Sequence, residues 1–187
     1  MKKLLFVSMI LMALLSCHKE EEQRIELSDD YFPLAIGNQW TFEVEGKKTI
    51  IDLTEVDGIE YYKFENDYGT FSYYRKEDGR VYIKEDKEDS KEEMLFDLAP
   101  IENKTWKYGV GYVTLISRKE VVEVGNSKID SCLLYSFHNI ELIDYGMFVW
   151  LAPGIGIVQV QYWGESPYLG PLQLENAIIN KQHIDLK

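Results

Sequence analysis

Cysteine and histidine, the side chains on which many catalytic and metal sites depend, are scarce in this sequence. The chain has two cysteines and three histidines, and the histidines are His18, His138 and His183. It contains neither the Gly-x-Ser-x-Gly motif of a serine nucleophile nor the His-Glu-x-x-His motif of a zinc protease. His138 and Glu141 would point to opposite sides of a strand, so we expect no metal site and no cofactor.

Catalysis has no positive signal in this chain. A hydrolase stays open as an alternative, because 32 acidic residues offer many chance pairs of carboxylates. No motif selects one of those pairs. We therefore assign no catalytic residue, and the sequence favours a protein that is not an enzyme.

Positive charge is also in short supply. The chain has 20 Lys and Arg against 32 Asp and Glu, so its net charge is −12 at pH 7. Nucleic acids and anionic lipid surfaces are bound through clusters of Lys and Arg. The composition therefore argues against a nucleic-acid partner and against electrostatic attachment to a membrane.

The sequence has no apolar run long enough to cross a membrane as a helix. Lys2 and Lys3 precede an apolar run over residues 4–15, whereas a membrane-spanning helix needs about 20 such residues. A basic start followed by a short apolar run is typical of an export signal. We therefore expect a cleaved signal and not a transmembrane anchor.

The end of this run resembles the lipobox of bacterial lipoproteins. It reads Leu14-Leu15-Ser16-Cys17, and the resemblance implies cleavage before Cys17 and acylation of that residue by chains such as palmitate. Several acyl chains together anchor a protein stably. An ordinary signal peptide that contains a cysteine is the alternative. The expected organisation is a signal peptide over residues 1–16, a lipidated cysteine and acidic tether over residues 17–30, and one domain over residues 31–187.

The residues after Cys17 bear on location. The stretch His18-Lys19-Glu20-Glu21-Glu22 resembles the tag that directs lipoproteins of the Bacteroidota type to the outer face of the outer membrane. A solvated tether is the alternative interpretation. We expect a protein anchored by lipid to the outer membrane, at the cell surface or otherwise on the periplasmic face. Cys132 would then be the only free thiol, and the apolar run around it predicts burial.

Alternating apolar and polar residues predict strands through most of the chain. Trp40, Phe42 and Val44 alternate with polar residues, as expected for a strand with one buried face. The dipeptides at 57–58, 78–79 and 125–126 are Asp-Gly, Asp-Gly and Gly-Asn, which favour tight hairpin turns.

Folding the chain about these turns predicts a register. The expected pairs are Leu53 with Tyr62, Ile51 with Phe64, Asp52 with Lys63, Tyr74 with Ile83, Glu77 with Arg80, Val122 with Ile129, and Glu123 with Lys128. Only residues 91–100 carry a helix signal, and Pro100 would end that helix. The sequence thus predicts an all-β domain: one strongly curved antiparallel sheet, as a half-barrel, open barrel or sandwich, built from hairpins, with at most one short helix.

Two blocks of sequence resemble a group of largely uncharacterised bacterial lipoproteins of the Bacteroidota type. They are YFPLAIGNQWTFE at 31–43 and LAPGIGIVQVQY at 151–162. The resemblance implies a curved all-β sheet related to half-barrel lipoprotein and lipid carriers, and it supplies no catalytic residue. Those carriers have helices on the concave face, which this sequence does not predict.

Aromatic residues offer the one candidate binding site. Residues 162–172 hold Tyr162, Trp163 and Tyr168 among glycines and prolines that exclude regular structure, and Tyr and Trp are enriched at interfaces. We expect a non-enzymatic binding or envelope-interaction module, anchored to the membrane by lipid, whose partner is an envelope protein, a glycan or an apolar ligand. The alternative is a carrier of a lipid or other apolar molecule in the concave face of the sheet.

Overall fold

The computed structural model describes residues 28–87, 89–98, 101–141, 145–164 and 170–186, and within them the chain forms strands and no helix. No helix in this part of the chain could therefore cross a membrane. The strands are β1 (Gln39–Phe42), β2 (Gly46–Val56), β3 (Ile59–Asn66), β4 (Phe71–Glu77), β5 (Arg80–Glu85), β6 (Glu93–Asp97), β7 (Thr105–Tyr108), β8 (Gly111–Val124), β9 (Ser127–Asn139), β10 (Gly146–Ala152), β11 (Gly156–Trp163), β12 (Leu172–Ile179) and β13 (Gln182–Asp185).

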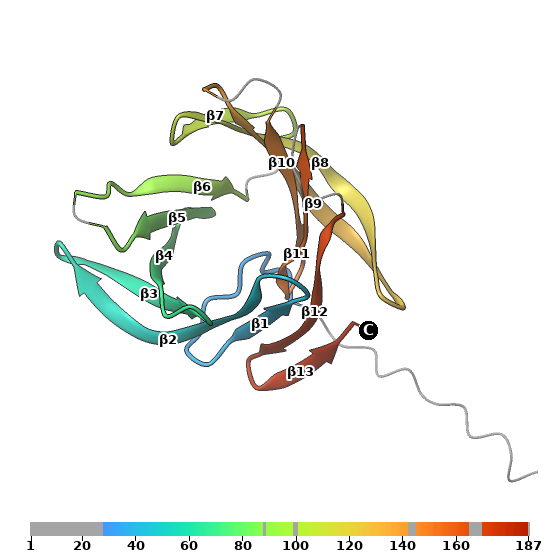
Figure 1. Ribbon diagram of the computed structural model, residues 1–187, viewed down its shortest axis with the longest axis horizontal. Coiled ribbons are helices and arrows are strands. Elements are labelled where there is room, and N and C mark those ends of the chain that lie inside the picture. Colours follow the sequence, from blue (N-terminus) through green and yellow to red (C-terminus); the bar gives the residue numbers. More distant parts are fainter. Residues whose placement is uncertain (1–27, 88, 99–100, 142–144, 165–169, 187) are drawn as a thin grey trace, which may run out of the picture.

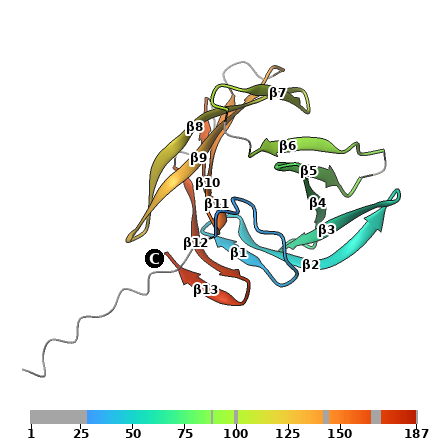
Figure 2. The same cartoon turned by 180° about the vertical axis from the view of Figure 1, so that it is seen from behind.

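All these strands belong to one antiparallel sheet that curves into a nearly closed barrel (Figures 1 and 2). The order is β6-β5-β4-β3-β2-β1-β12-β11-β10-β9-β8-β7, and β13 pairs with β12. The edge strands β6 and β7 lie next to each other. Side chains bridge them: the indole Nε1 of Trp106 donates to the carbonyl of Met94 at 2.9 Å, and the Glu93 carboxylate accepts from the amide of Gly109 at 3.0 Å. The predicted curved all-β sheet is confirmed.

The three predicted hairpin turns are all present. Asp57 and Gly58 both have positive φ, at 55° and 80°, and the turn at 78–79 repeats this pattern. Positive φ at both central positions defines the turn that matches the twist of two paired strands. At 125–126 only Gly125 has positive φ, as expected for the related turn with glycine first.

The predicted register holds for every pair but one. Ile50, not Ile51, faces Phe64, because a β-bulge lies between Ile50 and Asp52. The bulge turns Ile50 into the core and leaves Ile51 exposed. The pairs after the bulge, such as Leu53 with Tyr62, are as predicted.

One helix signal does not lead to a helix, and one local prediction is wrong. Residues 93–97 form strand β6 and no helix, because pairing with β5 satisfies their backbone groups while Leu95 and Phe96 are buried. Val44 does not continue the alternation of Trp40 and Phe42. Strand β1 ends at Phe42, and Val44 lies exposed in the turn to β2.

The segment before β1 fills one end of the barrel, which we call the plugged end; Figure 1 shows it in blue inside the curve of the sheet. Phe32 is buried, and its ring lies 5.6 Å from that of Tyr74 and 5.8 Å from that of Phe96. Asp30 fixes the segment to the wall, since its carboxylate pairs with Lys76 and its carbonyl accepts from the amide of Gly154. Hydrophobic burial and these polar contacts together close this end.

The two sequence blocks at 31–43 and 151–162 meet at the plugged end. The indole Nε1 of Trp40 donates to the carbonyl of Ile155 at 2.6 Å. Gly156 has a φ of 99°, and a Cβ on it would lie 3.3 Å from the same Nε1. Glycine therefore permits both the backbone conformation and the close approach. The blocks act as one structural joint between β1 and β11.

Candidate functional site

The opposite end of the barrel, which we call the open end, contains an apolar pocket of about 240 Å³. The turn between β7 and β8, the last residues of β9 and the first residues of β10 surround it. Its inward-facing side chains are mostly aromatic, and they include Tyr108, Phe137, Met147 and Tyr162. The rings of Tyr108 and Phe137 pack edge to face with centroids 5.7 Å apart, an arrangement that aromatic pairs favour.

Two further pockets continue this space into the barrel. Tyr145 and Tyr162 line both the first pocket and a second one of about 370 Å³. Glu45 and Lys48 line both the second pocket and a third one of about 70 Å³ that reaches Tyr74. Because neighbouring pockets share wall residues, we treat them as one concave space, the open-end cavity.

Among the described residues, Lys48 and Glu45 form an ion pair in the wall of this cavity. Lys48 pairs directly with Trp40 across β1 and β2, so the two side chains share the inner face of the sheet. Its Nζ lies 2.6 Å from a carboxylate oxygen of Glu45 and 5.3 Å from the ring centroid of Phe42. The ion pair places two opposite charges in the cavity wall, and these charges neutralise each other.

Tyrosine hydroxyls are among the other polar groups of the cavity, together with Asn66 and Asn139. Burial raises the pKa of Tyr108 to about 12, and burial also raises the pKa of Tyr74. Both phenols are therefore protonated at neutral pH and act as hydrogen-bond donors or acceptors. The cavity can orient a polar group, and its walls offer mainly aromatic contact.

The residues proposed from sequence do not form one surface. Tyr162 lines the open-end cavity, and its ring stacks on that of Tyr145 at 6.3 Å. Trp163 is the next residue of β11 and points to the outer face, where its ring stacks on that of His138 at 5.6 Å. Tyr168 and Cys17 lie outside the described residues. A binding role for Tyr162, Trp163 and Tyr168 stays a prediction.

The histidines do not assemble a metal site in the part of the chain that the structure describes. His138 lies on strand β9 with an exposed side chain. Within the described ranges, no three His, Cys, Asp or Glu side chains come together as metal ligands. Cys132 is fully buried, as predicted, and burial raises the pKa of its thiol to about 12.

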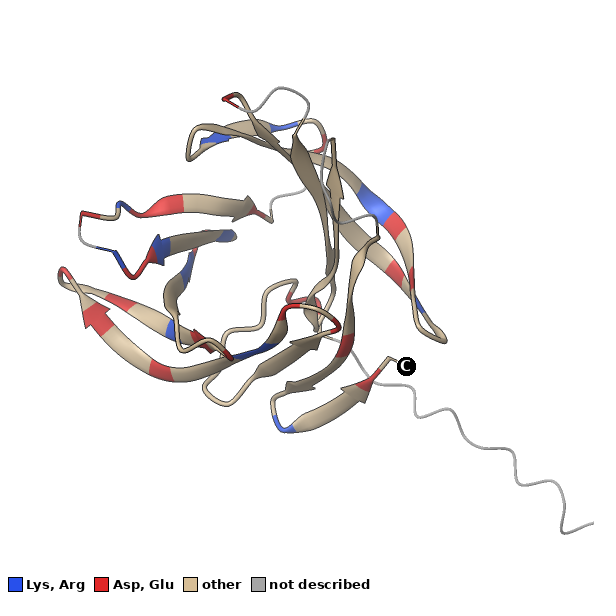
Figure 3. Ribbon diagram, in the orientation of Figure 1, with Lys and Arg blue, Asp and Glu red and all other residues tan. Residues whose placement is uncertain are grey.

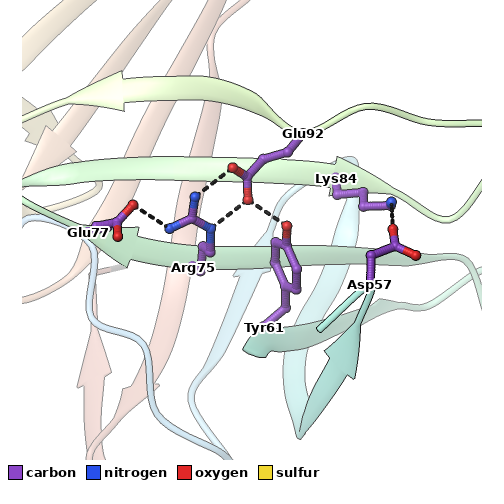
Figure 4. Close-up of polar contacts among 6 residues, drawn as sticks. All are labelled: Asp57, Tyr61, Arg75, Glu77, Lys84 and Glu92. Atoms are coloured by element: carbon purple, nitrogen blue, oxygen red, sulfur yellow. Dashed lines mark hydrogen bonds and ion pairs between the residues drawn. The ribbon is translucent and has the colours of Figure 1, made fainter. Parts of the chain in front are cut away.

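The outer face of β3–β5 carries a polar cluster that is a second candidate (Figure 4). Glu92 accepts hydrogen bonds from the Arg75 guanidinium at 2.5 and 2.6 Å and from the Tyr61 hydroxyl at 2.5 Å. Arg75 also binds Glu77, and nearby Lys84 binds Asp57. Because these charges are paired with one another, the cluster fastens the loop before β6 to the sheet and offers no free group to a ligand.

Comparison with known proteins gives a limited result. No family model and no curated protein matches the chain. One similar solved structure is a protein from Bacteroides fragilis NCTC 9343, described as exported and as having a YmcC-like fold. It has 14% identity and a TM-score of 0.42, over 78% of this chain and 97% of that one. Another is described as a lipoprotein from Parabacteroides distasonis ATCC 8503, with 10% identity and a TM-score of 0.41 over 79% and 95%. Similarity at this level supports no inference about activity.

Sequence reasoning found Tyr162 but missed the other main residues of the cavity. Lys48 carried no usable signal, because it shares the strand parity of Ile50, whereas the alternation in the sequence assigned the apolar face to Ile51. Tyr108 and Tyr145 carried none, because they meet Tyr162 only when the sheet curves. Their meeting depends on the strand order and not on any local pattern.

Proposed function

We propose that this protein is a lipid-anchored binding protein of the bacterial envelope that holds a small apolar molecule in the open-end cavity. The supporting observation is the aromatic lining of the first pocket, to which Tyr108, Tyr145 and Tyr162 all contribute. Ligand sites are concave and mostly apolar, with a few polar groups that orient the ligand. This proposal places the carrier alternative ahead of a module that binds only through its outer surface.

The chemistry of the wall favours a particular class of ligand. Aromatic rings and Met147 would contact an apolar body, while Lys48 with Glu45 would face a polar end. Because Glu45 already neutralises Lys48, an uncharged polar group such as a hydroxyl fits better than a free anion. The ligand we propose is therefore amphipathic and mainly apolar.

The proposed location rests on sequence. Acylation at Cys17 would anchor the protein, and residues 18–22 favour the outer face of the outer membrane within the lipoprotein group described above. The described chain begins at Ser28, just before the segment that fills the plugged end. An anchor at Cys17 would therefore join the domain next to the plugged end.

Native mass spectrometry tests the cavity directly. The buried core residues of the described chain all lie between Phe32 and Leu186, so a soluble chain from residue 23 onward contains all of them. We would purify this chain from its own envelope and record its mass before and after denaturation. An added mass of a few hundred daltons that is lost on denaturation supports the proposal. A bare polypeptide mass that persists after incubation with envelope lipid extract contradicts it.

Three variants locate the binding surface. An uncharged fluorophore, N-phenylnaphthylamine, reports on apolar binding by its increase in emission. Tyr162→Ala should weaken its binding about tenfold, because one aromatic wall is lost. Tyr73→Ala is the matched control, since Tyr73 lies on a strand of the opposite wall and its hydroxyl contacts Asp86 on the outer face. If Trp163→Ala weakens binding and Tyr162→Ala does not, the outer face of β11 is the site and the cavity is not.

A further inference from the structure

Arg118 is an exception in the charge pattern of this acidic chain. The other described arginines have carboxylate partners, since Arg75 pairs with Glu92 and Glu77, and Arg80 lies 3.8 Å from Asp97. Arg118 makes no side-chain hydrogen bond or ion pair with any described residue, and its Nε is buried without an acceptor. A buried guanidinium nitrogen without an acceptor lowers the stability of the folded protein. We therefore expect Arg118 to bind a group that can accept its hydrogen bonds.

The backbone at Arg118 departs from the regular pairing of β8 with β9. Ser117 pairs with Leu134 and Glu120 pairs with Cys132, so Arg118 and Lys119 together face one residue of β9. Two residues opposite one define a β-bulge, which re-aims the side chains it contains and is common beside functional sites. On the facing strand, Ser131 has a φ of 59°, which is strained for a residue with a Cβ. Both strands thus depart from regular geometry at this place.

These departures surround a polar pocket of about 560 Å³ at the plugged end of the barrel. Tyr31, Glu102, Arg118, Lys119 and Ser131 line it. The Tyr31 hydroxyl donates to the carbonyl of Ser131 at 2.8 Å, and a carboxylate oxygen of Glu102 accepts from the backbone amide of Arg118 at 3.2 Å. Figure 3 shows one basic band on β8, where the adjacent Arg118 and Lys119 lie.

We propose that Arg118 and Lys119 bind an oxyanion of the phosphate type in this pocket. A guanidinium presents a planar fork of donors that matches phosphate oxygens, and an adjacent ammonium adds a second positive charge. The anion supplies the acceptors that the described residues do not give Arg118. Glu102 lines the same pocket with its carboxylate at the backbone amide of Arg118, and its negative charge limits the affinity for the anion by repulsion.

Calorimetric titration of the soluble chain with inorganic phosphate at low ionic strength tests this site. Arg118→Gln should weaken binding about tenfold or more, because the bidentate contact is lost. Lys128→Gln is the matched control: it removes the same charge from the same hairpin at an exposed position outside the pocket, and it should change binding less than about twofold. Glu102→Gln should tighten binding several-fold, because it removes the opposing charge.

The Glu102 variant also separates this proposal from a purely structural one. If Glu102 served only to accept the hydrogen bond from the backbone amide of Arg118, Glu102→Gln would leave phosphate binding unchanged, which would overturn the proposal. Should Arg118→Gln fail to fold, Lys119→Gln tests the same pocket from an exposed residue, and we expect a several-fold loss. Phosphate binding that neither variant alters also overturns the proposal.

A second arm distinguishes a lipid headgroup from a soluble phosphate compound. The same chain would be sedimented with vesicles of phosphatidylethanolamine and phosphatidylglycerol. Vesicle binding that requires Arg118 and is displaced by free phosphate identifies a headgroup. Calorimetric binding without vesicle binding identifies a soluble compound, and absence of both rejects the site. Because this pocket lies at the plugged end, the outcome is independent of the open-end cavity.

Discussion

Replacing Trp40 with phenylalanine should destabilise the protein by an amount that the structure allows us to work out. The indole of Trp40 is buried, and its Nε1 donates to the carbonyl of Ile155 at 2.6 Å. Phenylalanine keeps a ring in the core but removes the donor and the second ring. The joint between the two sequence blocks at the plugged end would therefore lose its hydrogen bond.

The expected loss has two parts. A buried carbonyl left without its donor costs about 1–3 kcal/mol. Removing part of a buried aromatic side chain leaves a small cavity, which costs about 1–2 kcal/mol more. We therefore expect Trp40→Phe to lower the free energy of unfolding by about 3 kcal/mol, as measured by urea denaturation of the soluble chain with an unchanged slope.

Trp163→Phe is the control for this prediction. The Nε1 of Trp163 is also buried but has no acceptor among the described residues, so the substitution removes ring contact and no hydrogen bond. It should cost about 1 kcal/mol, or less if relief of the unsatisfied donor offsets the lost contact. Equal losses in the two variants would show that the bond from Trp40 to Ile155 contributes nothing beyond packing, and the structural joint would be refuted.

Three other outcomes follow from single sites. Burial raises the pKa of Glu92, but hydrogen bonds from Arg75 and a tyrosine outweigh this effect, so the pKa in the folded state is below 4.5. Glu92→Gln should therefore remove stability that is present above pH 4.5 and is lost as the pH falls through the folded-state pKa. Denaturation at several pH values measures this loss. Cys132, with its raised pKa, should not react with a thiol reagent at pH 8 in the native protein, and the denatured mature chain should show one thiol. A count of two would refute acylation of the lipobox cysteine. Gly156→Ala should cost about 1–2 kcal/mol more than Gly58→Ala in the same assay, since both have positive φ but only Gly156 has a neighbour within 4 Å of the added Cβ.

The sequence predicted those parts of the fold that local backbone chemistry controls. Asp57 with Gly58 could be recognised as a turn because few dipeptides tolerate positive φ at both positions. The bulge at Ile51 could not be recognised, because nothing in that residue's own chemistry differs from Ile50. The core selects Ile50 only once β2 lies against β1 and β3. The helix signal at residues 91–100 is overridden for a similar reason, since pairing with β5 decides the conformation of residues 93–97.

The candidate site was predicted only in part, because cavities arise from the curvature of the whole sheet. Tyr162 was singled out by its place beside glycine and proline, yet its partner Tyr145 comes from another strand connection. Arg118 carries no signal in the sequence, where it is one basic residue in a strand with alternating apolar and polar residues. Its lack of a carboxylate partner stands out only in the structure, where the other described arginines have such partners.

The two ends of the barrel use aromatic rings in different ways, and this difference carries the argument for function. At the plugged end, Phe32 enters from outside the sheet and packs against the rings of Tyr74 and Phe96, and Phe32 and Tyr74 form the inner boundary of the open-end cavity. At the open end, no described segment enters between Tyr108 and Tyr162, and their rings line a concave space. Closely packed aromatic cores contribute stability. Aromatic side chains that line an open cavity expose apolar surface to water, and a bound ligand would remove this surface from water. This asymmetry is the reason why we propose that a ligand binds at the open end and not at the plugged end.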